Sequence, residues 1–342
     1  MKRIHKGFKI YLAIFCAILV AAMIPITIFL IVPSVQRYRD RQNLAVYPVD
    51  KIEGGDYIHF LNTGSSDAIL LESQGHYALI DAGEDSDNPR GFENLEAAGY
   101  ENQVLDYLKT YAAGEDGKVH LDFVLGTHSH SDHIGGFDTI IRDPDVTIER
   151  AYLKVYNSST ILEKEVEEWD NQEVYDQMLD ALTMRGVPII SQMDQTPFSL
   201  GNFTITLFNT EDCDTEKVGE NDHSIGLLVE KEGTRVFLSG DIDNISGDEE
   251  RLAPQIGAVD LLKIGHHSYA HSTTVQWLKT LNPKVCVITN SPDSVYPLTL
   301  CNITRITRAP ILITGVEDGV VAQIGSGGDV QYFNHTHGLY GT

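Results

Sequence analysis

The stretch that decides the fold is Gly126–Gly136, which reads GTHSHSDHIGG. It places His128, His130, Asp132 and His133 within six positions. His128 and His130 stand two residues apart, so an extended backbone points both side chains to the same side. Neutral histidines clustered without a shared cation would desolvate one another for no gain, and imidazole with carboxylate suits zinc and related divalent ions. The stretch therefore predicts a metal site.

The residues around this stretch predict a strand, a loop and a helix. Leu121–Leu125 is a short apolar run of the kind found in a buried strand. The histidines then fall on a loop at the carboxyl end of that strand, where α/β folds place their ligands. Asp132 and His133 begin the next helix, where an aspartate is favoured by the helix dipole. The position of this loop and its composition together favour a functional site over a loop of ordinary polar residues exposed to solvent.

The rest of the chain alternates short apolar runs with turn signals. Two successive strand-rich halves, each with helices, predict an α/β sandwich of two sheets covered by helices. Beside Leu121–Leu125, the expected strands are Tyr57–Leu61, Ala68–Glu72, Tyr77–Ile80, a strand near Thr147–Val155, Phe203–Phe208, Ile225–Glu230, Arg235–Ser239, Leu261–Ile264, Val285–Thr289 and Ile311–Thr314. The main expected helices are Glu93–Tyr111, Leu162–Met184, Asp248–Gly257 and Thr273–Leu281.

Residues 1–36 predict a short cytoplasmic stub and a single membrane anchor. Ile10–Gln36 holds 27 residues without a charge, and about 20 apolar residues span a bilayer core. The alternative is a cleaved signal peptide, whose apolar region usually has only about 7–15 residues. Basic residues are slightly more numerous before the run than after it, which favours a catalytic domain outside the cytoplasm. Residues 37–55 are polar and predict a linker, and residues 56–342 predict the folded domain.

The folded part is strongly acidic. The chain has a formal net charge of −24; without residues 1–45 it retains 18 basic and 48 acidic residues, a formal charge of −30. Such a surface repels polyphosphate backbones at long range, so a nucleic-acid partner is disfavoured. A small anionic substrate held at a metal stays compatible with it. Outside the membrane run, Cys213, Cys286 and Cys301 form no CxxC pattern and are expected to be thiols.

HSHSDHIGG resembles the HxHxDH signature of the metallo-β-lactamase fold superfamily. Other elements of that family occur in its order: Leu79–Gly83 is similar to the LIDAG element, Ser239–Asp241 to the GD element and Lys263–Ser268 to the late histidine element. The resemblance covers roughly residues 56–330. It implies a four-layer αββα sandwich, and most members of the superfamily are hydrolases with one or two metal ions.

Within the superfamily, Phe60–Leu70, Asn221–Ser224 and LLKIGHHS are most similar to the branch that contains the extracellular domain of ComEC-type competence proteins and a phosphorylcholine esterase. The sequence departs from the usual GQGD of the first loop, because Gly64–Asp67 reads GSSD. Competence proteins of this type join such a domain to a channel of many helices. A single apolar run does not support a role as a DNA-uptake pore.

The resemblance implies two divalent ions, with Zn²⁺ expected. The implied metal ligands are His128, His130, Asp132, His133, His223, Asp241 and His266, and the implied catalytic residues are Asp132 and His267. Asp241 would bridge the two ions, and Asp132 would also orient the attacking water. His223 is the expected third histidine of the first ion, although that histidine is not always present in this branch. The reverse assignment of His266 and His267, with His267 as the ligand, stays open.

The implied function is a membrane-anchored, metal-dependent hydrolase, with a phosphodiester or related phosphoester of small size or from the cell envelope as its substrate. Hydrolysis would use a hydroxide formed between the two metal ions. The alternatives are hydrolysis of a lactone, thioester or lactam on the same fold, a di-iron redox protein, and a catalytically inactive binding module. The filled ligand positions disfavour the inactive module, and His130 stands where flavodiiron relatives have a carboxylate.

Overall fold

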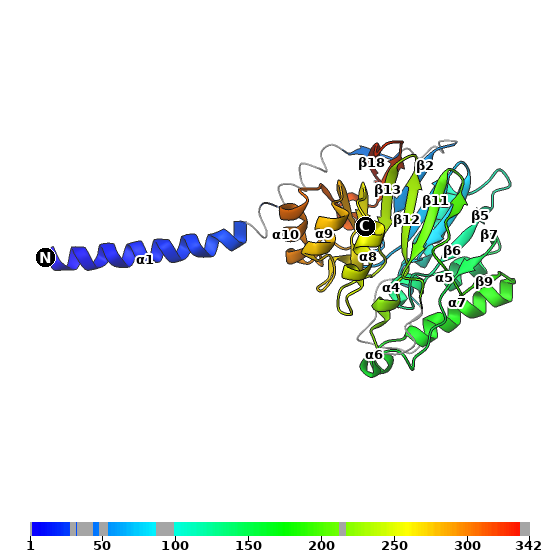
Figure 1. Ribbon diagram of the computed structural model, residues 1–342, viewed down its shortest axis with the longest axis horizontal. Helices are drawn as coiled ribbons and strands as arrows, with labels where there is room; N and C mark the ends of the chain where they lie inside the picture. Colours follow the sequence, from blue (N-terminus) through cyan, green and yellow to red (C-terminus); the bar gives the residue numbers. More distant parts are fainter. Residues whose placement is uncertain are drawn as a thin grey trace.

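The computed structural model describes residues 2–27, 32, 44–47, 54–86, 99–211 and 217–335, which form an N-terminal helix and an α/β domain (Figure 1). Most of the predicted linker, the beginning of the helix expected from Glu93, and Cys213 lie outside these residues. The described helices are α1 (Lys2–Ile26), α3 (Glu101–Tyr111), α4 (Ser131–Ile134), α5 (Phe137–Arg142), α6 (Glu163–Glu168), α7 (Asn171–Arg185), α8 (Asp248–Ile256), α9 (Val275–Leu281), α10 (Pro297–Ile306) and α11 (Thr314–Glu317).

The larger sheet has nine strands in the order β1-β18-β17-β2-β3-β4-β6-β8-β9. The neighbours β17, β2, β3 and β4 are antiparallel, and β4, β6, β8 and β9 are parallel. The strands are β1 (Ala45–Val46), β2 (Asp56–Phe60), β3 (Ile69–Ser73), β4 (His76–Ile80), β6 (Phe123–Leu125), β8 (Ala151–Tyr152), β9 (Ile189–Ile190), β17 (Val320–Ile324) and β18 (Val330–Asn334).

The second sheet has seven strands in sequence order, β10 to β16. It is antiparallel up to β13 and parallel from β13 onward. The strands are β10 (Phe198–Leu200), β11 (Phe203–Phe208), β12 (Gly226–Lys231), β13 (Thr234–Leu238), β14 (Leu261–Lys263), β15 (Val285–Ile288) and β16 (Ile311–Ile313). A separate pair is formed by β5 (Val119–Leu121) and β7 (Val146–Ile148).

Three hydrophobic cores separate four layers. Successive side chains of a strand point to opposite faces of its sheet. In β3, Leu70 packs into the core beneath α3, α5 and α7, whereas Leu71 packs into the core between the two sheets. In β13, Leu238 joins that central core, and Phe237 packs under α8, α9 and α10. The predicted αββα arrangement is therefore confirmed, with helices on both outer faces (Figure 1).

Three predicted elements are interrupted. The strand expected near Thr147–Val155 is divided into β7 and β8, which belong to different sheets. Leu121–Leu125 is not one strand: the backbone N–H of Asp122 donates to the Tyr77 carbonyl oxygen, and the chain passes there from β5, which pairs with β7, to β6, which pairs with β4. The acidic helix expected from Leu162 is also divided, because Trp169 has an extended backbone (φ −118°, ψ 156°) and separates α6 from α7.

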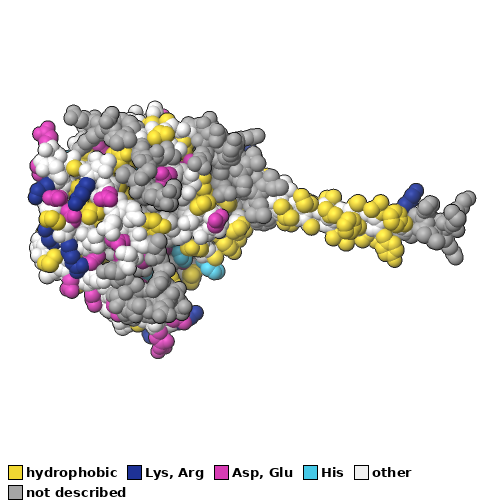
Figure 2. Space-filling view, turned by 180° about the vertical axis from the view of Figure 1, so that it is seen from behind, with side chains coloured by type: hydrophobic (Ala, Val, Ile, Leu, Met, Phe, Trp, Pro, Cys, Tyr) yellow, Lys and Arg dark blue, Asp and Glu magenta, His cyan; other side chains and the backbone are white. Residues whose placement is uncertain are grey.

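The N-terminal part combines an exposed apolar helix with an edge strand. Among the described helices, α1 alone is long and apolar enough to cross a membrane, over Phe8–Ile26, and hydrophobic side chains cover it in Figure 2. Within the predicted linker, Ala45 and Val46 form β1 and pair in parallel with β18. Tyr47 follows them and is buried, with its ring against those of Tyr57 and His59. The described part of the linker thus belongs to the larger sheet.

Candidate metal centre

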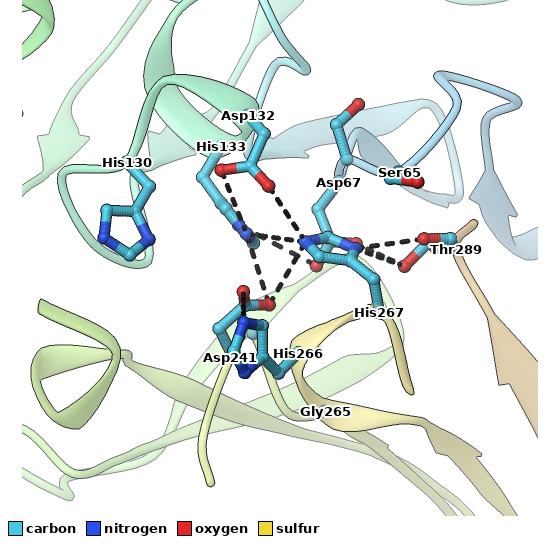
Figure 3. A network of polar contacts seen from close by, with 12 residues as sticks. Ser65, Asp67, His130, Asp132, His133, Asp241, Gly265, His266, His267 and Thr289 are labelled. Atoms are coloured by element: carbon cyan, nitrogen blue, oxygen red, sulfur yellow. Dashed lines mark hydrogen bonds and ion pairs between the residues drawn. The ribbon is translucent and has the colours of Figure 1, made fainter. Parts of the chain in front are cut away.

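The histidines and carboxylates of the motifs converge between the carboxyl ends of strands from both sheets (Figure 3). The loop after β6 carries His128 and His130, and α4 carries Asp132 and His133. The loop after β13 carries Asp241, and a 3₁₀ turn after β14, Gly265–Ser268, carries His267. Strands β6 and β14 belong to different sheets, so the site is built from both sheets, at the carboxyl ends of these strands.

The first group of ligand atoms consists of Asp132, His133, Asp241 and His267. His133 Nε2 and His267 Nε2 are 3.0 Å apart. Asp241 Oδ1 lies 3.2 Å from His133 Nε2 and 3.4 Å from His267 Nε2. Asp132 Oδ2 lies 3.3 Å from His267 Nε2. All four side chains can therefore contribute to a single small cation.

The second group consists of His128, His130 and Asp241. His128 Nε2 and His130 Nδ1 are 3.0 Å apart, and the ligand atoms of the three residues lie within 4.8 Å of one another. Burial lowers the pKa of His128 well below its usual value, and the neighbouring His133 and His130 lower it further. The imidazole is therefore neutral, as a metal ligand must be. Asp241 belongs to both groups and links them.

The opposite ring nitrogens show that the first group fits a divalent cation. His133 Nδ1 lies 2.8 Å from Asp81 Oδ2, and His267 Nδ1 lies 3.0 Å from the Thr289 carbonyl oxygen. Because those oxygens accept hydrogen bonds, each Nδ1 of a neutral ring carries the proton and Nε2 directs a lone pair to the centre. Two lone pairs 3.0 Å apart repel unless a cation lies between them, and histidines oriented by oxygen acceptors are typical of metal sites.

The charges of the cluster support the same conclusion. Four buried or half-buried carboxylates, of Asp67, Asp81, Asp132 and Asp241, surround the histidine rings and the ammonium group of Lys263. Burial alone would lower the pKa of His133, but the carboxylates of Asp241, Asp81 and Asp132 raise it well above its usual value. The cluster therefore attracts positive charge to the point where His133 meets Asp241.

The structure adds Lys263 and Asp67, which were not predicted as site residues. Lys263 is completely buried; its Nζ lies 2.5 Å from Asp67 Oδ2 and donates to the Gly240 carbonyl oxygen at 2.8 Å. Asp67 also accepts a hydrogen bond from Thr289 Oγ1, at 2.5 Å. The only sequence signals were a lysine inside the apolar run LLKIG and the aspartate of the altered GSSD loop.

Glu165 is a further residue that the sequence did not indicate. It lies on α6, in the region predicted only as an acidic helix, and its Oε1 lies 2.9 Å from His130 Nε2. Glu165 also accepts from the backbone N–H of Glu220, at 3.1 Å, and from Asn171 Nδ2, at 3.1 Å. These bonds fix the ring of His130, so that its Nδ1 faces His128.

The structure exchanges the predicted positions of His266 and His267. His267 is completely buried within the first ligand group, whereas the His266 side chain is 26% exposed and its Nε2 lies 4.0 Å from Asp241 Oδ2. Both residues have left-handed backbones, with φ of 47° and 45°. This conformation costs a non-glycine residue of order 1 kcal/mol or more. The geometry favours His267 as the ligand, which is the alternative that the motif left open.

His223 lies beside the second group but not in it. It lines a small cavity behind the ring of His128, together with Lys154. Lys154 Nζ donates to the His223 carbonyl oxygen at 3.1 Å. The neighbouring Ser224 contacts the cluster instead, with Oγ 3.2 Å from His128 Nδ1. Among the described residues, the ligand groups do not include His223, so its predicted role as a ligand is not supported by the geometry.

A cleft of about 360 Å³ opens from the cluster to solvent. His130, Asp132 and Asp241 form its inner end. Residues of α6 and the turn that follows it form one wall, and Ile245, His266 and Tyr269 contribute to the other side. A substrate that enters this cleft reaches both ligand groups.

Comparison with known families identifies a match over this whole region. The family model described as the beta-lactamase superfamily domain matches residues 76–289. The match begins at β4, ends just after β15, and includes every residue of the two ligand groups. The resemblance inferred from the motifs is thereby confirmed.

Among curated proteins, two relatives are similar to this chain. ComE operon protein 3 of Bacillus subtilis is 24% identical over 181 residues, which cover 52% of this chain and 21% of that protein. Recombination protein 2 of Haemophilus influenzae is 25% identical over 233 residues, which cover 67% of this chain and 24% of that protein. The matched regions thus span about a quarter or less of these relatives. Among solved structures, the metallo-beta-lactamase fold protein YhfI from Bacillus subtilis aligns with a TM-score of 0.47 and 14% identity, over 81% of this chain and 99% of that one.

Proposed function

The chain belongs to the beta-lactamase superfamily, and on this basis we propose that it is a membrane-anchored hydrolase that cleaves phosphoester bonds, above all phosphodiesters, with two divalent metal ions. The observation that carries the proposal is the pair of ligand groups joined by Asp241. Paired metal ions about 3.5–4 Å apart are typical of phosphatases and nucleases, because both the attacking and the leaving oxygen then receive charge stabilisation. We assign the ligands as His128, His130, Asp132, His133, Asp241 and His267.

The protein residues have separate tasks in this proposal. The bound cations would lower the pKa of a water molecule to near 7 and stabilise negative charge on the phosphoryl oxygens. Asp132 has a side chain 23% exposed to the cleft, so it orients the attacking water. Asn221 Nδ2 lies 3.2 Å from His266 Nδ1. The same Nδ2 lies 3.3 Å from His266 Nε2. Either ring nitrogen can therefore accept from the amide, and the other nitrogen of the neutral ring then carries the proton that it can donate to a phosphoryl oxygen.

The charges of the cleft favour some phosphoesters over others. Among the described residues that line it, Lys164 is the only lysine or arginine, while Glu165, Glu168, Asp222 and Asp243 bring carboxylates. Such a surface opposes a long polyanion, although the name of the relative Recombination protein 2 makes nucleic acid a substrate to test. A small or zwitterionic phosphoester meets less repulsion.

We further propose that α1 anchors the enzyme, with the catalytic domain outside the cytoplasm. Its exposed apolar stretch, Phe8–Ile26, has 19 residues, close to the number that spans a bilayer core. Since β1 belongs to the larger sheet, we place the beginning of the folded domain near residue 44 rather than at residue 56.

The proposal is tested by metal analysis of the purified full chain in detergent, together with hydrolysis of bis-p-nitrophenyl phosphate. Two metal ions per chain and metal-dependent cleavage are expected. Asp241→Ala removes the shared ligand, so it should lose bound metal and activity together. His120→Ala is the matched control, because His120 is exposed and pairs with Asp116 on the surface; it should keep both.

The other outcomes separate the alternatives. Two metal ions without diester cleavage would favour a lactone, thioester or lactam substrate, and a panel of those esters and amides identifies it. Metal without hydrolysis of any of these compounds would favour a binding module. A purified chain that binds no divalent metal at micromolar concentration would refute the proposed mechanism.

A further inference from the structure

The walls of the cleft are unusually apolar for an exposed surface. Four large side chains line it while remaining partly in solvent: Leu162 (47% exposed), Trp169 (38%), Ile245 (67%) and Tyr269 (38%). Outside α1 and residue 32, the described residues include ten exposed large hydrophobic side chains, so four of the ten gather at one opening. An apolar surface gathered at the mouth of a polar site indicates a ligand with an apolar part.

These side chains come from separate elements of the fold. Leu162 and Trp169 flank α6, Ile245 lies on the loop after β13, and Tyr269 follows the 3₁₀ turn that carries the metal-centre histidines. No single helix therefore presents them as one stripe. On the face of the domain drawn in Figure 2, exposed histidine side chains lie beside hydrophobic ones.

Between the apolar rim and the metal centre, the cleft combines aromatic rings with carboxylates. The indole of Trp169 stacks on the ring of His130, with centroids 5.0 Å apart and planes at 29°. Glu168 and Asp222 line the same cleft. Aromatic faces next to carboxylates attract ammonium groups, by cation–π contact and by charge. An anionic head group would be repelled here, because Lys164 alone opposes the carboxylates.

We infer that the substrate is a membrane amphiphile: a phosphodiester with a cationic head group and apolar chains, which is the chemistry of a zwitterionic phospholipid. The inference rests on the proposed phosphodiesterase function and names its substrate class. The head-group cation lies between Trp169 and the carboxylates, the phosphate at the metal centre, and the first part of the chains along Leu162 and Ile245. The apolar helix α1 supplies the second, independent observation, since it would keep the cleft beside a bilayer.

The reaction balances as a hydrolysis. The oxygen of water forms a bond to phosphorus, and one of the two ester P–O bonds breaks. The electron pair of that bond stays on the leaving oxygen, which takes a proton and departs as an alcohol. The phosphomonoester keeps the remaining ester bond, and the second proton of the water passes to solvent.

The test compares four phosphodiesters with the purified, metal-loaded full chain. Phosphatidylcholine and phosphatidylglycerol with identical chains are presented in mixed micelles, and glycerophosphocholine and bis-p-nitrophenyl phosphate are presented in solution. The expected kcat/KM for phosphatidylcholine is about tenfold or more above those for phosphatidylglycerol and for glycerophosphocholine. The first ratio reports the cationic head group, and the second reports the apolar chains.

A matched pair of variants locates the apolar contact. Ile245→Asp and Met184→Asp each place a carboxylate at an exposed apolar position (67% and 65% exposed), but only Ile245 lines the cleft. Ile245→Asp should lower the ratio of phosphatidylcholine to bis-p-nitrophenyl phosphate hydrolysis about tenfold, whereas Met184→Asp should leave that ratio unchanged.

The outcomes distinguish this inference from the proposed function. Hydrolysis of bis-p-nitrophenyl phosphate with no preference for phosphatidylcholine over glycerophosphocholine would overturn the amphiphile and leave the phosphodiesterase standing. A preference for phosphatidylglycerol would overturn the cationic head group. Failure to cleave any of the four compounds, with metal bound, would overturn the phosphodiesterase proposal and this inference with it.

Discussion

Replacing Lys263 with methionine should destabilise the metal-free protein by about 4 kcal/mol at pH 7. Lys263 is completely buried, with Nζ 2.5 Å from Asp67 Oδ2 and 3.7 Å from Asp241 Oδ1. Methionine nearly keeps the volume but leaves the Asp67 carboxylate buried without its cation. Breaking a buried ion pair from one side typically costs 3–5 kcal/mol. Uptake of a proton limits the loss, because neutralising an ordinary aspartic acid (pKa about 3.9) at pH 7 costs about 4 kcal/mol.

The same reasoning sets the pH dependence of the loss. At pH 5 the cost of protonating an ordinary aspartate falls to about 1.5 kcal/mol, so the destabilisation should shrink toward that value. Urea unfolding of the chelator-treated full chain in detergent, followed by tryptophan fluorescence at pH 7 and at pH 5, measures both free energies of unfolding. Lys284→Met is the matched control: Lys284 pairs with Asp260 at 2.7 Å but is 65% exposed, so its loss should stay below about 1 kcal/mol.

A double-mutant cycle with Asp67→Asn completes the test. With both charges removed, the combined variant should be more stable than the sum of the single losses predicts, by about 2–3 kcal/mol. A Lys263→Met loss below about 1 kcal/mol at pH 7, an equal loss at both pH values, or simple additivity would each refute the argument that this pair balances buried charge.

Three further predictions concern the metal ligands, the pH response and the edge strand. Glu165→Gln should weaken the affinity for one metal ion about 10–100-fold in chelator competition, whereas Glu168→Gln on the same helix should not; equal effects would contradict the role of the bond to His130. Burial raises the pKa of Glu249 to about 7, above its value in an unfolded chain, so the stability that its protonation supplies is present at low pH and is lost as the pH rises through 7. Glu249→Gln should therefore make the urea midpoint less dependent on pH between pH 5 and 8. An unchanged dependence on pH would exclude Glu249 as its cause. Tyr47→Ala should lower the free energy of unfolding by about 3 kcal/mol, because a buried ring is lost. A loss below about 0.5 kcal/mol, measured from the urea midpoint, would mean that β1 adds little to the stability of the sheet.

The fold was largely predictable because its strands are short, apolar and separated by turn residues. Phe203–Phe208, for example, was expected and found with the same bounds. The strands that were missed have other causes. Ile189–Ile190 has two residues and offers no period to detect. Val330–Asn334 alternates weakly and is half-buried, and it lies next to the edge strand β1, between β1 and β17. Its strand identity depends on those partners rather than on its own composition.

The ligand residues of the histidine motif were predictable from the sequence, whereas the residues that hold the ligands in place were not. The HSHSDH spacing brings its four residues together because one loop and one helical turn hold them. His266 and His267 are neighbours, and which of them enters the centre depends on two left-handed backbone positions that no side-chain pattern reveals. Lys263 and Glu165 support the centre from distant elements, and sequence spacing carries no signal for contacts of that kind.

The pairing of β1 with β18 limits how far the catalytic domain can travel. Tyr47 is fixed in the larger sheet, so only residues 27–44 lie between the end of α1 and the beginning of β1. At about 3.3–3.6 Å per residue, these 18 residues reach roughly 60 Å at most. With α1 in a bilayer, the cleft stays within that distance of the lipid, and the effective concentration of membrane molecules around it is in the millimolar range. Dilution of the enzyme would then leave its encounters with membrane molecules unchanged, and its turnover would follow their density in the bilayer.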